Sequence, residues 1–155
     1  CFPARRGQGA FCNGSPIRLS SADRLEDSLL SVGTVPGRRE LADTAFRQMR
    51  ALYDACQDVR RTGCASLDLC WVACGRLDGY VELSLQPWDY AAGMLIVAEA
   101  GGRGPGHRPG WQPAFPVSGR PPAGLQWAAP QHAANNFERM RALLWTCAFP
   151  PRPGN

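Results

Sequence analysis

The sequence predicts an α/β fold, because short apolar segments typical of strands alternate with longer segments of helical periodicity. Residues 28–33 and 79–83 have the length and apolar content of strands, whereas 38–57, 63–75 and 89–100 have those of helices. The 155 residues suffice for one domain or most of one. A hydrophobic content of 45% excludes a disordered tail or a collagen-like repeat.

The first half of the chain predicts a hairpin, a strand and a helix, in that order. Asn13-Gly14 lies between two short extended segments within residues 8–20, and both residues tolerate a positive φ, as a tight hairpin turn requires. Residues 28–33, SLLSVG, predict a buried strand that ends at Gly33. Over residues 38–57, apolar side chains recur every three or four positions and predict one face of an amphipathic helix. These are Leu41, Ala45, Met49, Leu52 and Cys56.

Residues 63–75 begin and end with glycine, and their interior is small or apolar apart from Ser66 and Asp68. This composition predicts a mostly buried helix. The strand expected over 79–83 places Glu82 near its end.

The last periodic segment begins at Asp89, which suits a helix N-cap, and ends before the pair Gly101-Gly102. Its longest apolar run, residues 91–98, is much shorter than the roughly 20 residues that a membrane helix needs. Residues 103–130 have no periodicity and predict a loop, and 133–146 have the pattern of a final helix.

The positive charge is concentrated in the second part of the chain. Residues 1–102 carry 11 Arg and 12 acidic residues, whereas 103–155 carry 6 Arg and one acidic residue, Glu138. Such a tail is either an arm for nucleic acid or a poorly structured extension. We favour the extension because the arginines are scattered singly; out-of-frame translation of a GC-rich gene would have the same composition.

The seven cysteines include no C-x-x-C pair. Cys70 and Cys74 are one helical turn apart and could share a metal, but small core residues are the favoured interpretation. Unpaired thiols fit a reducing, cytoplasmic compartment. Because the chain starts at Cys1 and its first methionine is Met49, we expect it to begin inside a larger protein.

From the residues alone, before any resemblance to a family is considered, each of three positions has two interpretations. Asp89 is a capping residue or a metal ligand, and Glu82 is a solvated strand-end carboxylate or a binding group. The small residues 63–65 either allow close helix packing or expose the free N–H groups of a helix start to an oxygen acceptor.

Three stretches together resemble one family: residues 4–20, residues 59–89 and WDYAAGMLIVAEAGG at 88–102. They resemble the C-terminal half of an inositol monophosphatase-type, magnesium-dependent sugar-phosphate phosphatase, whose signature is W-D-x-A-A-G, an apolar run and E-A-G-G. The resemblance implies a layered α/β sandwich, of which residues 1–102 form the C-terminal portion. An irregular tail rich in Pro, Gly and Arg follows over 103–155.

The resemblance also implies roles for single residues. Asp89 corresponds to one ligand of a Mg²⁺ cluster, and Glu82 to the group that accepts a hydrogen bond from a substrate hydroxyl. Gly63, Cys64 and Ala65 correspond to the segment that lines the substrate pocket with backbone amides. Cys64 departs from the family, which has Ser, Thr or Ala there.

Two further sets of residues receive no catalytic role. Arg60 and Arg61 suit phosphate contacts, but a solvated pair is the favoured interpretation. His107 and His132 fall in the irregular tail and are assigned nothing.

The family's upstream motif, D-P-x-D-G-[ST], is absent from the 155 residues, so we expect little or no phosphatase activity from this chain alone. The expected whole enzyme hydrolyses inositol monophosphate or a similar polyol phosphate. Histidinol phosphate, fructose bisphosphate and an adenosine bisphosphate remain open as substrates. The expected partner is a missing N-terminal half or a second copy, with no membrane. The alternatives are a truncated, non-catalytic chain and, more remotely, a nucleic-acid binder acting through the tail.

Overall fold

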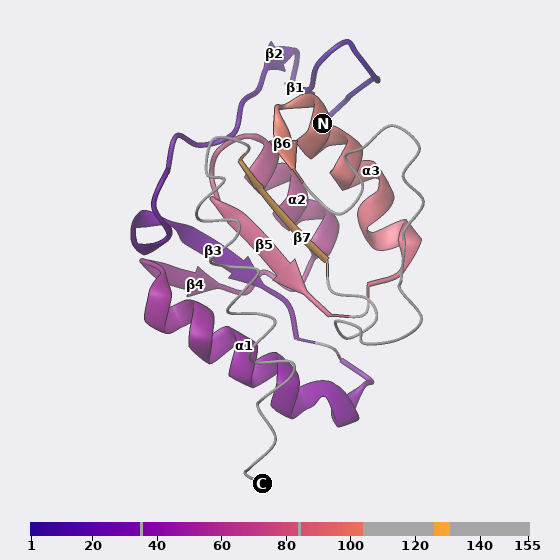
Figure 1. Cartoon of the computed structure of the whole chain (residues 1–155). Helices are drawn as coiled ribbons and strands as arrows, with labels where there is room; N and C mark the ends of the chain where they lie inside the picture. Colours follow the sequence, from indigo (N-terminus) through magenta and orange to yellow (C-terminus); the bar gives the residue numbers. More distant parts are fainter. Residues whose placement is uncertain (35, 84, 104–125, 131–155) are drawn as a thin grey trace, which may run out of the picture.

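The computed structural model describes residues 1–34, 36–83, 85–103 and 126–130 (Figure 1). The helices are α1 (Ala42–Ala55), α2 (Ala65–Ala73) and α3 (Pro87–Glu99). The strands are β1 (Phe11–Cys12), β2 (Ser15–Pro16), β3 (Leu29–Val32), β4 (Asp58–Arg60), β5 (Gly79–Glu82), β6 (Gly102–Arg103) and β7 (Gln126–Pro130). Within these residues, no helix combines the length and the apolar character that crossing a membrane requires.

A five-stranded mixed sheet forms the centre of the molecule, in the order β4-β3-β5-β7-β6. Strands β4, β3 and β5 are parallel, whereas β7 runs antiparallel to both β5 and β6. Ser31 lies opposite Tyr80 and Val32 opposite Val81 in the central pair. Helices alternate with the parallel strands along the chain, which confirms the α/β class expected from the sequence.

The helices cover opposite faces of this sheet (Figure 1). One apolar cluster joins β3 and β5 to α1, and a second joins β5 to α2 and α3, which pack against each other. Because side chains alternate along a strand, Val81 belongs to the first cluster and its neighbour Tyr80 to the second. The first contains Leu25, Leu30, Val32, Leu52 and Val81; the second is centred on Leu69, Val72, Ala73, Tyr80 and Val97.

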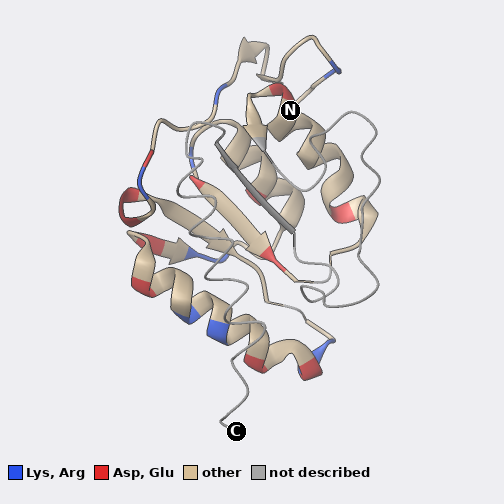
Figure 2. Ribbon diagram, viewed as in Figure 1, with Lys and Arg blue, Asp and Glu red and all other residues tan. Residues whose placement is uncertain are grey.

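The hairpin and the first helix follow the sequence prediction closely. Asn13 and Gly14 have φ values of 50° and 85°, as a tight turn between antiparallel strands requires. Helix α1 is preceded by a 3₁₀ turn at Arg39–Leu41. Acidic and basic side chains are mixed along α1 (Figure 2), and its buried face includes the polar Gln48.

Two details of the sequence prediction are corrected, and one strand is added. Residues 58–60, which received no prediction, form strand β4 by pairing with β3. Residues 126–130, within the predicted loop 103–130, form strand β7 between β5 and β6. Helix α3 begins at Pro87, so its N-cap is Gln86 and not Asp89. The predicted helix over 133–146 lies outside the described residues.

Candidate functional site at the carboxyl ends of the parallel strands

The parallel strands direct three connections to one edge of the sheet. The segment after β3 leads to α1 on one face, whereas those after β4 and β5 lead to α2 and α3 on the other. Neighbouring parallel strands whose connections leave toward opposite faces form a topological switch point, where α/β proteins bind ligands. The site therefore lies where β3 and β5 end, at Gly33 and Glu82.

Glu82 is the half-buried carboxylate at the end of β5. The Tyr80 hydroxyl donates a hydrogen bond to its Oε2. A β carbon on Gly33 would lie 2.0 Å from the carboxyl carbon, so the Glu82 side chain occupies space that only glycine leaves open. Burial raises the pKa of Glu82, although the hydrogen bond from Tyr80 and the charge of Arg61 oppose this shift.

A small hollow borders Glu82 on the α1 side of the sheet. Its lining includes Gly33 and Glu82 from the strand ends and Gln48 and Met49 from α1. Apart from Glu82 and Gln48, the lining side chains are apolar. This combination matches ligand sites in general, where a few polar groups are set among apolar side chains.

Arg61 connects the segments that follow β3 and β4. Its Nε and Nη2 atoms donate hydrogen bonds to Thr34 Oγ1 over 3.0 and 2.8 Å. Its charge opposes the rise that burial causes in the pKa values of Glu82 and Asp68. Arg61 is exposed, as the sequence led us to expect, yet Thr34 holds it beside the site.

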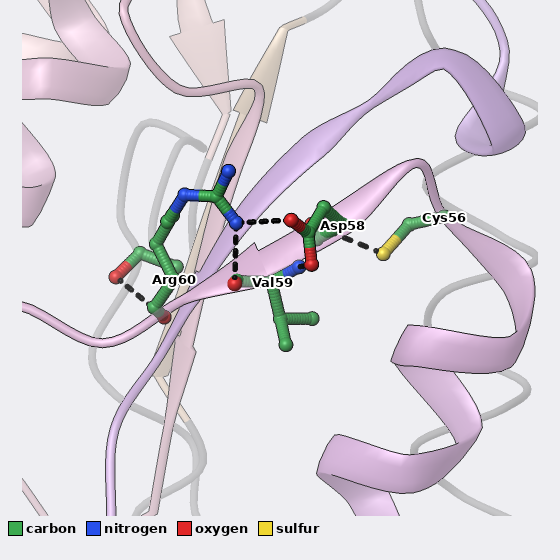
Figure 3. A network of polar contacts seen from close by, with 5 residues as sticks. Cys56, Asp58, Val59 and Arg60 are labelled. Atoms are coloured by element: carbon green, nitrogen blue, oxygen red, sulfur yellow. Dashed lines mark hydrogen bonds and ion pairs between the residues drawn. The ribbon is translucent and has the colours of Figure 1, made fainter.

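Arg60 has a different environment at the edge of the sheet (Figure 3). Its guanidinium forms an ion pair with Asp58 and donates to the Val59 carbonyl over 3.0 Å. Both contacts lie within β4, so Arg60 stabilises its own strand. This local pairing agrees with the favoured interpretation of a surface arginine.

Gly63, Cys64 and Ala65 form the turn that begins α2. Gly63 has a φ of +81°, a conformation that favours glycine. Cys64 is the N-cap of α2, but its side chain makes no capping hydrogen bond. Its N–H donates instead to Thr62 Oγ1 over 3.2 Å. Gly63 and Cys64 are exposed, so the turn is accessible from solvent, and its role in substrate binding stays a prediction.

Asp89 is the third residue of α3, where its carboxylate completes a capping box. Asp89 Oδ2 accepts the Gln86 N–H over 3.0 Å, and the Asp89 N–H donates to the Gln86 carbonyl over 2.9 Å. Asp89 lies in the first turn of α3, which follows the end of β5 at Glu82, and its charge contributes to the raised pKa of Glu82.

Capping leaves Asp89 able to act as one oxygen ligand, because a carboxylate has about four acceptor positions. Mg²⁺ needs near-octahedral oxygen coordination from several groups. Among the described residues, no group of three His, Cys, Asp or Glu side chains is arranged to hold a metal ion. Asp89 therefore fits a Mg²⁺ site only as a single contributor, and that role stays a prediction.

Cys70 lies in α2 and Cys74 is the C-cap of that helix, and both carry free thiols. Cys70 packs against the core cluster of α2 and α3, and burial raises the pKa of its thiol. The Cys74 thiol donates to the Trp71 carbonyl over 3.6 Å. These surroundings favour the core interpretation over a shared metal.

Three residues of the site received no role from the sequence: Asp68, Tyr80 and Gly33. Asp68 is 2% exposed and accepts a hydrogen bond from Thr62, and burial raises its pKa. It is the lone carboxylate within the apolar segment 63–75, and this local pattern is a signal for it in the sequence. Gly33 and Glu82 are in contact although they are 49 positions apart in the chain, so no local sequence pattern indicates this contact.

The chain is similar to proteins of known family. The model of the inositol monophosphatase family matches residues 1–140. The Nus factor SuhB of Escherichia coli strain K12 is 48% identical over 101 residues, which are 65% of this chain and 38% of that protein. The SuhB of Haemophilus influenzae is 46% identical over the same length.

Solved structures show the same fold. An inositol monophosphatase from Anabaena (Nostoc) sp. PCC 7120 superposes with a TM-score of 0.77 at 36% identity, covering 91% of this chain and 53% of that one. The suhB protein of Bartonella henselae superposes with a TM-score of 0.74 at 34% identity, covering 92% and 51%. The chain thus spans 38% of its curated relative and about half of these structures. On the sequence match and on the fold, this chain belongs to the inositol monophosphatase family.

Proposed function

We propose that this chain is the substrate-binding and partial metal-binding half of a Mg²⁺-dependent phosphomonoesterase that acts on inositol monophosphate or a similar small polyol phosphate. The proposal is supported by the topology: Glu82, Asp89 and the segment Arg61–Ala65 all lie at or just after the carboxyl ends of the parallel strands β4 and β5. Family membership supports the phosphatase class.

Glu82 would bind the polyol. An ionised carboxylate only accepts hydrogen bonds, and sugar hydroxyls donate them. The hydrogen bond from Tyr80 occupies Oε2 and holds the side chain against Gly33, so Oε1 is oriented before a ligand arrives. Such preorganisation lowers the entropic cost of binding.

The turn that begins α2 would meet the anionic part of the substrate. The first N–H groups of an α-helix have no acceptor within the helix and attract anions. Arg61, held by Thr34, places a guanidinium beside this turn, since its Nη1 lies 3.2 Å from the position of a β carbon on Gly63. Arginine suits phosphate because its planar donors match two oxygens at once.

Asp89 would be one ligand of Mg²⁺. When bound, such an ion activates water and neutralises charge on the phosphate ester. The described residues offer it no complete site, so we propose that the remaining ligands belong to the D-P-x-D-G-[ST] motif that this sequence lacks. The chain alone should therefore release little or no phosphate.

Phosphate release from inositol monophosphate tests this proposal. We expect none from the purified chain in Mg²⁺. Release should appear when a polypeptide carrying the upstream half of a relative is added. Asp89→Asn should abolish that release and Glu82→Gln should raise KM, whereas the control Asp78→Asn, at the opposite end of β5, should change neither. Robust release by the chain alone, or no release from the combined halves, would contradict the proposal.

A non-catalytic binding role is the second candidate. Two observations favour it: no group of three His, Cys, Asp or Glu side chains among the described residues could hold a metal ion, and the curated relatives bear the name Nus factor. Inositol phosphate binding without turnover in the combined halves would support it. Nucleic-acid binding through the basic tail stays a remote proposal, since residues 104–125 and 131–155 lie outside the described part. It predicts an affinity that falls steeply with salt.

We also propose a cytoplasmic location and association with a second copy or a missing half. The six described cysteines are free, as a reducing compartment would keep them. Phe46 and Tyr53 are 58% and 55% exposed on the outer side of α1, and Trp88 is 79% exposed. Large exposed aromatics of this kind favour association. A monomeric elution volume in size-exclusion chromatography would contradict it.

A further inference from the structure

Asp68 is a buried carboxylate that core packing does not explain. It lies in the first turn of α2 and is 2% exposed. Its Oδ2 accepts the Thr62 hydroxyl over 2.8 Å, and the buried Ser31 hydroxyl also stabilises the carboxylate, whereas no described group makes a well-directed hydrogen bond to the buried Oδ1. Burying a charged group with incomplete pairing is costly, so a residue of this kind at a helix start calls for a role beyond packing.

Two routes connect Asp68 to the peptide groups of Cys64. The Asp68 N–H donates to the Cys64 carbonyl over 3.0 Å. The side chain acts through Thr62, whose single hydroxyl proton is directed to Asp68 Oδ2. The Thr62 oxygen is then left as an acceptor, and it accepts the Cys64 N–H over 3.2 Å.

This arrangement replaces an ordinary helix cap. An N-cap side chain usually accepts an N–H of the first turn, but the Cys64 thiol makes no such bond. The turn also contains Gly63 at a φ of +81°, which the unfolded chain adopts only part of the time. Without another anchor, the start of α2 would sample several conformations.

We propose that Asp68 is a positioning residue: through the Thr62 hydroxyl it holds the turn Thr62–Ala65 in the conformation that presents the amide groups at the start of α2. Asp68 itself touches no ligand in this proposal. Only the use of the turn for substrate rests on the proposed function. The conformational role of Asp68 does not depend on the proposed function.

Hydrogen exchange of the Cys64 amide, followed by NMR without ligand, tests the conformational role. Asp68→Asn keeps the shape of the side chain but removes the charge that strengthens the hydrogen bond from Thr62, and it replaces one acceptor oxygen with a donor. We expect the Cys64 amide to exchange about fivefold faster, the effect of losing one hydrogen bond. Thr62→Val, which removes the hydroxyl, should act equally, and Thr62→Ser, which restores it, should exchange as the parent chain does.

Matched controls separate positioning from stability. Asp78→Asn alters another carboxylate that accepts a backbone N–H, that of Leu29 over 2.6 Å, but does so away from the turn. It should leave Cys64 exchange unchanged. In the double variant Asp68→Asn with Thr62→Val, the Cys64 amide should exchange no faster than in either single variant. Both substitutions disrupt the same hydrogen-bonded connection from Asp68 through Thr62 to Cys64. Unchanged exchange in both single variants, or equal acceleration in Asp78→Asn, would overturn the proposal.

A ligand measurement separates this proposal from the proposed function. In the combined halves described above, Asp68→Asn should raise KM for inositol monophosphate about fivefold and leave kcat nearly unchanged, because the turn binds and does not react. A parent chain that fails to bind, with Cys64 exchange accelerated in Asp68→Asn, would overturn the proposed function and support the positioning role. A lower kcat at unchanged KM would overturn the positioning role.

Discussion

Gly33→Ala tests the contact that orients Glu82. Gly33 does not adopt a left-handed φ, so alanine introduces no backbone strain, and its effect comes from the added methyl group. That β carbon would lie 2.0 Å from Glu82 Cδ, whereas ordinary contact begins at 3.4 Å. The carboxyl group therefore has to move by about 1.4 Å, the difference between these distances. A displacement of this size breaks the hydrogen bond from Tyr80.

The pKa of Glu82 is the sharpest readout. Burial is the largest cause of its raised pKa, so a carboxyl group pushed toward water should titrate nearer the ordinary value, about 4.3. Loss of the Tyr80 hydrogen bond acts in the opposite direction but is the smaller effect. Titration of the side-chain carboxyl ¹³C resonance by NMR measures the change.

The effect of Gly33→Ala on the free energy of unfolding should depend on pH in a defined direction. Because its pKa is raised, Glu82 contributes stability that is fully present below the pKa of the unfolded chain and is lost as pH rises through the folded value. Gly33→Ala removes that contribution and one hydrogen bond. We therefore expect a loss of about 1–2 kcal/mol below about pH 4.3 and a smaller loss at neutral pH.

Gly93→Ala is the matched control. Its β carbon would lie 2.7 Å from Leu69 Cβ, so alanine there forces α2 and α3 apart and destabilises the fold. It should leave the titration of Glu82 unchanged. An unchanged Glu82 pKa in Gly33→Ala, or the same shift in both variants, would refute the steric reasoning.

Three further substitutions test the surroundings of the site and the core. Tyr80→Phe should raise the pKa of Glu82 further, because the lost hydrogen bond lowers it; a downward shift in the ¹³C titration would contradict this. The Glu99 carboxylate accepts the N–H groups of Gly7 and Gly9, over 2.9 and 3.0 Å, and these bonds lower its pKa. It thus contributes stability above the ordinary glutamate pKa that is lost as pH falls through its folded value. Glu99→Gln should lower Tm at pH 7 and flatten its acid dependence in thermal melts followed by circular dichroism; identical melts would argue against the contact. Leu52→Ala removes a fully buried side chain from the α1 cluster and should cost about 2–5 kcal/mol in urea unfolding, and a loss under 1 kcal/mol would be inconsistent with that burial.

Local features made several elements predictable from the sequence. Apolar side chains at spacings of three and four indicated α1, and the Asn13-Gly14 pair indicated the hairpin turn because both residues adopt a positive φ. The position of Glu82 at a strand end was also correct. Each of these signals depends on residues close together in the chain.

Features that depend on pairing partners were not predictable in the same way. Strand β4 has three residues and becomes a strand only by pairing with β3, and β7 forms only between β5 and β6. The capping of α3 shifted because Pro87 begins the helix and Gln86 provides the cap. Short strands and exact helix starts depend on free-energy differences that local propensity does not resolve.

The sequence by itself determined the hairpin, the order of the three helices and of strands β3 and β5, and the family signature, because periodicity and motif spacing are local properties. Only the tertiary structure decided that Asp68 is buried and hydrogen-bonded to Thr62, and that the Glu82 side chain fills the space that a β carbon on Gly33 would occupy. Parallel strand pairing brings the ends of distant segments to one edge of the sheet, and no local pattern records which side chains then meet there.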